Sequence, residues 1–317
     1  MGWGCGLAVV VVGSLSKGFR LNDRVHAGGK PVGLLGASSF VGACVIQRLR
    51  TNGRRTIAFS RSPPDDKAES EVTWVQLLSA VAVSRQAFPI KEWVCVAPIW
   101  ALPQYFAMIE ESGACRVVAL SSTSLFAKKD SPDPGEQALV RGLHAGEQVL
   151  RTWAEARGVE WVILRPTLIY GLGQDRNVTE ILGFVRRWGF FPLLGQATGL
   201  RQPVHAEDVA TACVSALTVP AAGNRAYNLS GGETLSYREM VCRVFAAIGK
   251  NPQLLTIPRW LFRLAVVALR LLPRYRNWTT EMAERMNHDL VFDHGDAARD
   301  LGFSPRPFQL SQGDVPT

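Results

Sequence analysis

The sequence is poor in cysteine, and none of its cysteines stands in a metal-binding or redox motif. The 317 residues include six cysteines, with no Cys-x-x-Cys pair and no histidine at metal-ligand spacing. Four of the six fall inside apolar runs, where a free cysteine behaves as a small core residue. We therefore expect reduced thiols, no bound metal and a cytoplasmic location.

Long basic runs and apolar stretches of membrane-spanning length are also absent. The net charge of +8 comes from 28 arginines and only 7 lysines, scattered with no run of five or more. This scatter favours a small polyanionic ligand or a membrane surface as partner and argues against nucleic acid. The apolar run near the start is too short to span a bilayer and follows no Lys or Arg. We interpret residues 1–30 as a leader of uncertain order, with a signal peptide as the alternative.

Strand-like and helix-like segments alternate after this leader. Runs rich in β-branched residues predict strands at residues 31–35, 55–60, 72–75, 92–97, 116–121 and 160–165. The segments between them have helical spacing, which implies βαβ units and a doubly wound parallel sheet. We therefore predict an α/β fold with an NAD(P)-binding Rossmann domain at residues 31–170. Residues 171–317 are expected to form a smaller mixed substrate lobe, interleaved with the end of the sheet.

The heptapeptide GASSFVG stands where the first predicted strand turns into a helix. In such a turn, glycines permit a tight bend and a close backbone approach to a pyrophosphate, which the helix N-terminus attracts. Two glycines fit the outer positions, whereas a serine occupies the place of the usual middle glycine. The residues expected to hold a dinucleotide here are Gly36, Ser38, Ser39, Phe40, Val41 and Gly42.

The end of the second predicted strand, AFSRSPP, bears on the choice of dinucleotide. NAD sites usually have an acidic residue here for the ribose 2′-hydroxyl, whereas NADP sites use arginine for the 2′-phosphate. The sequence has Ser60 and Arg61, with no carboxylate before Asp65. We therefore expect NADP, held in part by Arg61, with NAD as the alternative.

Five motifs follow one another along the chain: GASSFVG, VVALSSTSLF, VILRPTLIYGLG, LRQPVHAEDVA and DHGDAARDLGFSPR. In this order they resemble the extended and atypical short-chain dehydrogenase/reductases of the NAD-dependent epimerase/dehydratase family, over residues 31–307. Members of that family hold NAD(P) on a Rossmann sheet and often act on nucleotide-linked sugars. The resemblance implies a keto-sugar reductase or an epimerase acting on a nucleotide-diphosphate sugar.

The resemblance also implies roles for residues at two strand ends. Ser122 or Thr123 matches the hydroxyl that hydrogen-bonds and polarises a substrate oxygen. Pro166 lies in the Arg-Pro-Thr segment that runs against the nicotinamide, and Ala97 is placed at the cofactor as well. These residues are the candidates for the reacting end of the site.

Substrate contacts are implied farther along the chain. Arg201 matches the arginine that pairs with the substrate diphosphate, a task suited to a guanidinium fork. Arg176 and Asn177 stand in a loop that touches substrate in such enzymes. Asp208 is expected to cap the helix that follows.

One departure from the family pattern concerns the proton-transfer residues. The family carries Tyr-x-x-x-Lys on the helix after the fifth strand, but Leu139 and Leu143 occupy those positions here. The nearest substitutes are Arg141 and His144, and His144 is the catalytic candidate because histidine titrates near neutrality. A second hypothesis is therefore a non-catalytic NADP-binding protein that serves as an assembly or membrane-docking partner.

Residues 258–278 combine a dominant apolar character with five arginines and two tryptophans. This composition suits a helix lying on an anionic membrane surface, which would place the protein at the inner face of the membrane. A buried helix of the smaller lobe and a contact between the copies of a homodimer are the alternatives.

Overall fold

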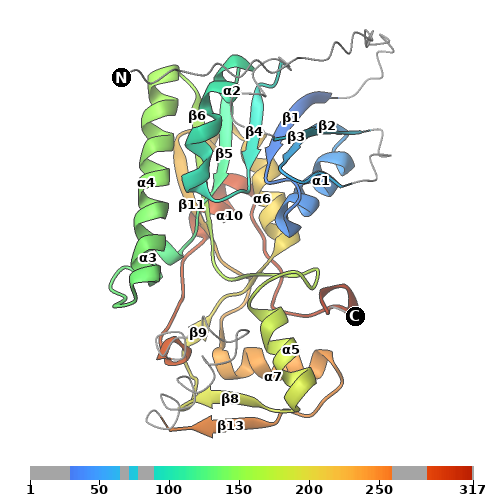
Figure 1. Ribbon diagram of the computed structural model, residues 1–317, viewed down its shortest axis with the longest axis vertical. Helices are drawn as coiled ribbons and strands as arrows, with labels where there is room; N and C mark the ends of the chain where they lie inside the picture. The colour runs from blue at the N-terminus through green and yellow to red at the C-terminus, as the bar shows by residue number, and fades with distance from the viewer. Residues whose placement is uncertain (1–28, 65–70, 78–88, 259–283, 316–317) are drawn as a thin grey trace, which may run out of the picture.

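The central feature of the fold is a sheet of seven parallel strands. The computed structural model describes residues 29–64, 71–77, 89–258 and 284–315 (Figure 1). Across the sheet the strands follow the order β3 (Val72–Gln76), β2 (Arg54–Ser60), β1 (Gly29–Leu35), β4 (Glu92–Cys95), β5 (Arg116–Leu120), β6 (Glu160–Pro166) and β11 (Arg225–Leu229). All six predicted strands are present, and the predicted Rossmann-type α/β fold is confirmed.

The strand order reverses between β1 and β4. β1 pairs with β2 on one side and with β4 on the other, so that Leu35 lies opposite Phe59 and Cys95. In open α/β sheets such a reversal leaves a crevice at the carboxyl ends of the strands, where ligands bind. The turn at residues 36–42 follows β1 directly, so the fold places it at this crevice.

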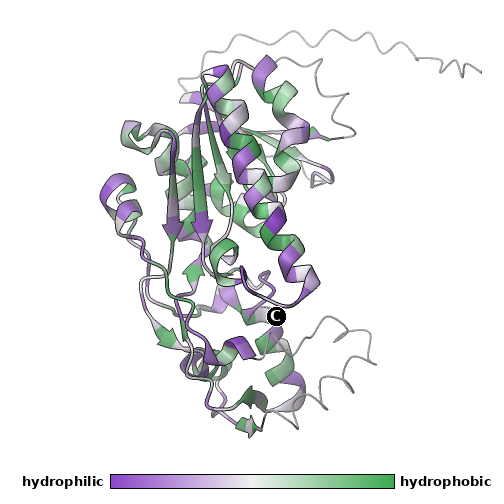
Figure 2. Cartoon of the chain, turned by 90° about the vertical axis from the view of Figure 1, so that its left-hand side faces the viewer, coloured by the Kyte–Doolittle hydropathy of each residue, from purple (hydrophilic) through white to green (hydrophobic). Residues whose placement is uncertain are grey.

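Helices cover both faces of the sheet. α1 (Phe40–Thr51) and α6 (Ala206–Thr218) pack against one face and against each other. The 3-10 helix η2 (Ile99–Tyr105), α2 (Phe106–Glu111) and α4 (Pro134–Arg157) cover the other face. In Figure 2 the strands are predominantly hydrophobic, whereas the helices alternate hydrophobic and hydrophilic residues. This pattern is the expected consequence of burying a sheet on both sides.

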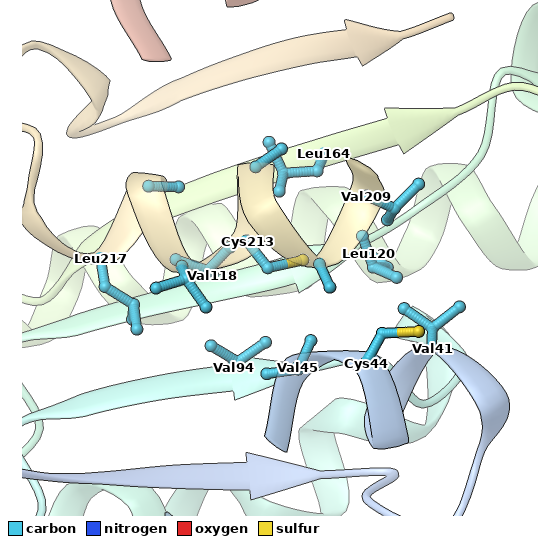
Figure 3. Close-up of a cluster of buried hydrophobic side chains, with 14 of the residues drawn as sticks. Val41, Cys44, Val45, Val94, Val118, Leu120, Leu164, Val209, Cys213 and Leu217 are labelled. Atoms are coloured by element: carbon cyan, nitrogen blue, oxygen red, sulfur yellow. The ribbon is translucent and has the colours of Figure 1, made fainter. Parts of the chain in front are cut away.

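A cluster of aliphatic side chains holds α1 and α6 against the sheet (Figure 3). It includes the thiols of Cys44 and Cys213, which are free and buried. Burial raises the pKa of Cys44 to about 11 and that of Cys213 to about 12, so both stay protonated at neutral pH. The expectation that cysteines in apolar runs are core residues is confirmed for these two.

A smaller lobe lies beyond the carboxyl edge of the sheet (Figure 1). It contains α5 (Val178–Trp188), β8 (Phe191–Leu194), α7 (Tyr237–Ala247) and β13 (Leu254–Ile257), with β8 and β13 paired in parallel. Its apolar core is separate from the two clusters that flank the sheet. The predicted smaller C-terminal lobe is therefore present, although α6 and β11 from the same half of the chain complete the sheet. The division of the chain at residue 170 stays a prediction.

Short elements connect the sheet to the smaller lobe. β7 (Ile169–Tyr170) pairs with β10 (Val204–His205), and β9 (Leu200–Arg201) pairs with β12 (Leu235–Ser236). The remaining short helices are α3 (Ser124–Ala127), η3 (Pro220–Ala222), η5 (Arg285–Asn287), α10 (Gly295–Leu301) and η6 (Gln312–Asp314).

The start of α6 differs from the expectation based on the sequence. The capping side chain is His205, whose Nδ1 accepts a hydrogen bond from the N–H of Glu207 at 3.2 Å. Asp208 lies in the first turn, and its carboxylate accepts hydrogen bonds from the guanidinium of Arg306. The prediction that Asp208 caps this helix is therefore wrong, because an imidazole one turn earlier already does so.

Two segments considered in the sequence analysis lie outside the described residues. These are residues 1–28 of the leader and, apart from Pro258, the basic apolar segment 258–278. Residues 29 and 30 form the start of β1. In the part of the chain that the structure describes, no helix combines the length and the apolar character needed to cross a membrane.

Candidate functional site

The candidate site lies along the carboxyl ends of the sheet strands. Because all seven strands are parallel, their carboxyl ends share one edge. The turn beginning at Gly36 follows β1, Ser60 ends β2, and Ala97 stands just after β4. Ser122 follows β5, and Pro166 ends β6. The fold thus brings residues from five separate strand ends to one edge of the molecule.

The turn after β1 has no room for side chains at its two glycines. Gly36 has φ +83°, and a Cβ there would lie 2.6 Å from the backbone nitrogen of Ala97. A Cβ at Gly42 would lie 2.5 Å from the carbonyl oxygen of Gly36 and 2.6 Å from that of Ala37. The turn therefore packs backbone against backbone, as expected where one glycine permits the tight bend and another lets the helix pack closely on the strand.

Ser39 closes this turn and caps α1. Its hydroxyl donates to the carbonyl oxygen of Gly36 at 2.8 Å and accepts from the N–H of Gly42 at 3.0 Å. The hydroxyl is thus engaged within the turn, which explains how serine replaces the usual middle glycine. The N–H groups of Phe40 and Val41 belong to the first turn of α1, where a helix offers them no acceptor. The Val41 side chain is buried in the core, so only its backbone faces the turn.

A cavity of about 680 Å³ adjoins the turn on the β2 side. Its lining includes Ser38, Ser39, Ser62 and Trp74. Ser60 donates a hydrogen bond to the hydroxyl of Ser38 at 3.0 Å, in the place where NAD sites carry a carboxylate. Arg61 follows Ser60 and is exposed, although it is not among the residues that line the cavity.

A second cavity, of about 620 Å³, lies on the β5 side of the turn. Ser122, Thr123, Arg176, Asn177 and Arg201 all contribute to its lining. Gln174 lines both cavities, so the two meet at this side chain. The structure therefore brings the predicted polarising and substrate-binding residues together, next to the predicted dinucleotide turn.

The two hydroxyls after β5 are not equivalent. Thr123 is buried, and its hydroxyl donates to the carbonyl oxygen of Pro166 at 3.2 Å. The Ser122 oxygen accepts from the N–H of Ser124 at 3.1 Å, and its hydroxyl hydrogen has no acceptor among the described residues. Ser122 is also only half-buried, so it is the hydroxyl that can donate to a ligand.

The second cavity is lined by several positively charged side chains and by no described carboxylate. Lys128, Arg176, Arg201 and Arg285 line it, and none of its described lining residues is Asp or Glu. Arg176 is exposed, and no carboxylate of the described chain lies within ion-pair distance of its guanidinium. Such a cavity favours a ligand with more than one negative charge.

Arg201 is held mainly by backbone carbonyls. It is 5% exposed, and its Nη1 donates to the carbonyl oxygens of Leu200 and His288, each at 2.7 Å. Its Nη2 donates to the carbonyl oxygen of Arg285, and the guanidinium stacks on the ring of Tyr237. Burial lowers the pKa of Arg201 to about 10, so it remains charged at neutral pH. Arg201 lines the cavity, while two of its N–H groups hold the segment 285–288.

The loop that carries Arg176 and Asn177 is fixed by Asp175. The buried carboxylate of Asp175 accepts hydrogen bonds from the N–H of Asn177 at 2.9 Å and of Val178 at 2.6 Å. Asp175 thereby takes the capping role at the start of α5, and Arg176 projects from a rigid turn. Sequence reasoning missed this residue, although an aspartate just before a helix is a common capping signal.

His144 is not brought to either cavity. It is exposed on α4 and lines neither of them. Leu143, at the position of the family lysine, is 3% exposed and packs in the core between α4 and the sheet. This stretch of α4 therefore turns an apolar face to the sheet, with no proton-transfer group directed into the second cavity.

Glu147 is another site-forming residue that sequence reasoning missed. It is 4% exposed on α4, and its Oε1 accepts from the hydroxyl of Ser121 at 2.6 Å. Its carboxylate binds Arg165 with two hydrogen bonds, of 2.8 and 2.5 Å. Glu147 stands four residues after Leu143 on the apolar face of α4, and a carboxylate on a buried face needs such partners.

The electrostatic balance at Glu147 favours its ionised form. Burial alone would raise its pKa, but hydrogen bonds from Arg165 and Ser121, with the charges of Arg165 and Arg151, outweigh burial. The pKa of Glu147 is consequently held below its usual value. This carboxylate joins α4 to the carboxyl ends of β5 and β6, beside Ser122 and Pro166.

Comparison with known proteins identifies a family that part of this chain resembles. Residues 104–230, which run from within η2 to the residue after β11, match the model of the NAD dependent epimerase/dehydratase family. The chain is similar to this family over these residues. The resemblance stated from the sequence motifs is thus confirmed.

Curated relatives of the chain differ in the reactions named for them. The UDP-glucose 4-epimerase of Vibrio cholerae is 24% identical over 213 residues, which cover 64% of this chain and 62% of that enzyme. The 2-alkyl-3-oxoalkanoate reductase of Stenotrophomonas maltophilia is 24% identical over 309 residues, which cover 86% of this chain and 93% of that enzyme. The chain spans 52% and 62% of the length of two of the curated relatives that it matches.

Solved structures share the fold of this chain. MoeE5 in complex with UDP-glucose and NAD has a TM-score of 0.64 at 19% identity, covering 88% of this chain and 94% of that chain. At this level of identity the likeness establishes the fold alone.

Replacing Gly42 with alanine should destabilise this protein by about 1–3 kcal/mol, because the added Cβ meets two carbonyl oxygens of the turn. Gly142→Ala is the matched control, since Gly142 is also helical and its Cβ would meet only the Trp100 ring at an ordinary 3.5 Å. Chemical denaturation of both variants measures the difference. Equal losses of stability in the two variants would contradict the packing described for the turn.

Replacing Glu147 with glutamine should cost about 3–5 kcal/mol of unfolding free energy at pH 7, because it leaves the mostly buried Arg165 without its counter-charge. The folded-state pKa of Glu147 is depressed, so its contribution is present above the unfolded-state pKa of about 4.3 and is lost as pH falls through the folded value. Urea denaturation at pH 3 to 7 should show a smaller acid loss in E147Q than in the wild type. The exposed Glu155→Gln on the same helix serves as control, and an identical pH profile for E147Q and the wild type would refute the interpretation.

Proposed function

We propose that the chain binds a nicotinamide dinucleotide along the carboxyl edge of its sheet and acts on a nucleotide-diphosphate sugar in the second cavity. The reaction class is keto-sugar reduction or epimerisation. The observation that carries the proposal is the cavity itself, where Ser122 faces a space lined by four cationic side chains and no described carboxylate. The names of the relatives, an epimerase of UDP-glucose and a keto-acid reductase, support the same reaction class.

The turn after β1 fits a dinucleotide. Gly36 and Gly42 allow the tight packing of the turn, and the first N–H groups of α1 are available to phosphate oxygens. The cavity beside Ser38 and Trp74 offers room for the adenosine end. When bound, the nicotinamide exchanges a hydride with a substrate carbon. On this proposal residues 31–170 hold the cofactor and residues 171–317 supply the substrate side.

NADP is the dinucleotide that we favour for this site. β2 ends in Ser60, at the position where NAD sites carry a carboxylate that would repel a 2′-phosphate. Arg61 follows and is exposed, so its guanidinium is available to a 2′-phosphate. NAD, which is present in the MoeE5 complex, is the alternative.

On the substrate side, each residue has a separate task. Arg176 and Asn177 stand at the rigid start of α5, where the free guanidinium suits a diphosphate. Ser122 donates its hydroxyl hydrogen to the sugar oxygen on the carbon that is oxidised or reduced, which favours negative charge developing on that oxygen. His144 has no place in this arrangement because it is exposed outside the cavity.

A non-catalytic binding protein is the second candidate function. The observation that favours it is the burial of Leu143 in the core, at the position where family enzymes carry lysine. On that view the site binds a dinucleotide for assembly or membrane docking, with residues 258–278 or a second copy of the chain as the contact. A cytoplasmic location, suggested by the reduced cysteines, suits both functions.

Arg61→Ala should raise the Kd for NADPH about tenfold or more and leave the Kd for NADH nearly unchanged, because only NADPH carries the 2′-phosphate. Titration of the protein's fluorescence with each cofactor measures both constants. Arg48→Ala, an exposed arginine on the far part of α1, is the control for a general loss of charge. Equal effects of R61A on the two cofactors would refute the assignment to the 2′-phosphate.

Ser122→Ala should abolish turnover of NADPH with a UDP-4-keto sugar while leaving UDP binding intact, because the serine acts on the sugar oxygen and not on the diphosphate. Arg176→Gln should instead raise the Kd for UDP about tenfold. Stopped assays of NADPH loss and calorimetric titration with UDP separate the two effects. Saturable NADPH binding by the wild type with no turnover of any keto or epimerisable sugar would favour the binding protein.

A further inference from the structure

The carboxyl-terminal segment 303–315 connects the sheet to the smaller lobe. Phe303 packs in the core beside α1 and α6, whereas Phe308 packs in the core of the smaller lobe. The segment ends with η6, and Figure 1 shows the end of the chain at the junction of the sheet and that lobe. This segment therefore contacts both parts of the molecule that border the two cavities.

Asp314 is the buried carboxylate of this segment. It is 4% exposed, and its Oδ1 accepts from the N–H of Leu172 at 2.9 Å and lies 3.1 Å from Nε2 of His205. Because Nδ1 of His205 already accepts the N–H of Glu207, Nε2 carries the hydrogen that is directed at Asp314. The other oxygen, Oδ2, accepts from the N–H and the hydroxyl of Ser311, at 2.9 and 2.7 Å.

These hydrogen bonds keep the Asp314 carboxylate ionised. Burial alone would raise its pKa, but the hydrogen bonds from Ser311, Leu172 and His205 outweigh burial and hold the pKa below its usual value. Hydrogen bonds to a charged group are stronger than those between neutral groups, so the bond to the Leu172 N–H is a firm restraint.

Leu172 belongs to a loop whose backbone needs such a restraint. Gly171, Leu172 and Gly173 all have positive φ, of +126°, +55° and +61°. A leucine seldom adopts this region, because its Cβ crowds the backbone, and it does so only where the surrounding structure imposes it. Gly171 is confined as well, since a Cβ there would lie 2.7 Å from Nε2 of His205.

The same loop, residues 171–177, reaches both cavities. Gln174, two residues after Leu172, lines both of them, and Arg176 lines the second. The Asp175 cap fixes the end of the loop to α5, whereas Asp314 fixes its beginning next to the start of α6. The places of both lining side chains relative to the sheet thus depend on the contact at Leu172.

We propose that Asp314 is a positioning residue for both ligands, which holds Leu172 and thereby sets the places of Gln174 and Arg176. The inference rests on the proposed function, since it takes a dinucleotide and a nucleotide diphosphate as the ligands of the two cavities. Asp314 lines neither cavity and acts through the loop. A loop released from Asp314 has to be ordered when a ligand binds, and the cost of ordering lowers the affinity.

Asp314→Ala should raise the Kd for UDP and the Kd for NADPH, each about tenfold, because the loop then becomes ordered only on binding. Asp300→Ala is the matched control. The Asp300 side chain is 8% exposed against 5% for Asp314, and it accepts a hydrogen bond from Tyr227 at 3.0 Å, but it lines neither cavity. Calorimetric titration measures both constants at a temperature where the variants are folded. Asp314→Asn, which keeps an acceptor oxygen without the charge, should give intermediate values and carries the same test if Asp314→Ala does not fold.

Hydrogen exchange tests the contact at Leu172 without any ligand. The amides of residues 171–177 should exchange faster in the Asp314 variants than in the wild type, because the Leu172 N–H loses its acceptor. Asp300→Ala should leave the exchange of this loop unchanged.

The possible outcomes separate the positioning role from the proposed function. Unchanged exchange of the loop in the Asp314 variants would overturn the restraint at Leu172, and the positioning role with it. An unchanged Kd for either ligand, or an equal loss of affinity in Asp300→Ala, would overturn the positioning role and leave the proposed function standing. Failure of the wild type to bind both UDP and NADPH would refute the proposed function, and the positioning of those ligands with it.

Discussion

The ion pair between Glu147 and Arg165 is the interaction on which the geometry of the candidate site depends. Its carboxylate reaches from α4 to Ser121 and Arg165, which stand beside Ser122 and Pro166. The carboxyl ends of β5 and β6, which carry Ser122 and Pro166, are thus joined through one buried group. A carboxylate kept charged inside a protein is costly unless all its oxygens are satisfied, and here they are.

The second constraint on the site is the contact of the first turn with the loop after β4. Backbone atoms of Gly36 and Ala97 approach closely where the strand order reverses, so the crevice is narrow at that point. From there the two cavities open on either side and meet at Gln174. One cavity is bordered by small hydroxyl side chains and the other by cations, which suits a long ligand with chemically different ends.

Much of this arrangement could be predicted from the sequence because it follows from periodicity and turn chemistry. The six strands of the first half are continuous β-branched runs, and GASSFVG occurs where a strand must bend into a helix. The smaller lobe was harder to predict because its strands have only two to four residues and obtain their partners from distant parts of the chain. The cap of α6 was assigned to Asp208, because an aspartate is the usual cap and the pairing with Arg306 crosses about a hundred residues.

The sequence predicted which residues lie at the candidate site better than it predicted what each of these residues does there. The sequence alone does not show which of Ser122 and Thr123 can donate to a ligand. In the structure the Thr123 hydroxyl already donates to the carbonyl oxygen of Pro166, so this role is left to Ser122. His144 is adjacent to Leu143 in sequence, but the helical turn of about 100° per residue carries it to the solvent side. Lys128 and Arg285 are 157 positions apart, and no local pattern indicates that Glu136 draws them together.

The placement of Arg201 has a consequence for the electric field in the second cavity. Its guanidinium is held by three carbonyl oxygens and is almost without contact with water. Mobile ions in solution cannot gather around such a charge, whereas they screen the exposed Arg176 within a Debye length of about 8 Å at physiological ionic strength. The cavity therefore keeps part of its attraction for anions in concentrated salt. Lysine at this position would conserve the charge and lose the planar fork that three carbonyls from two segments require.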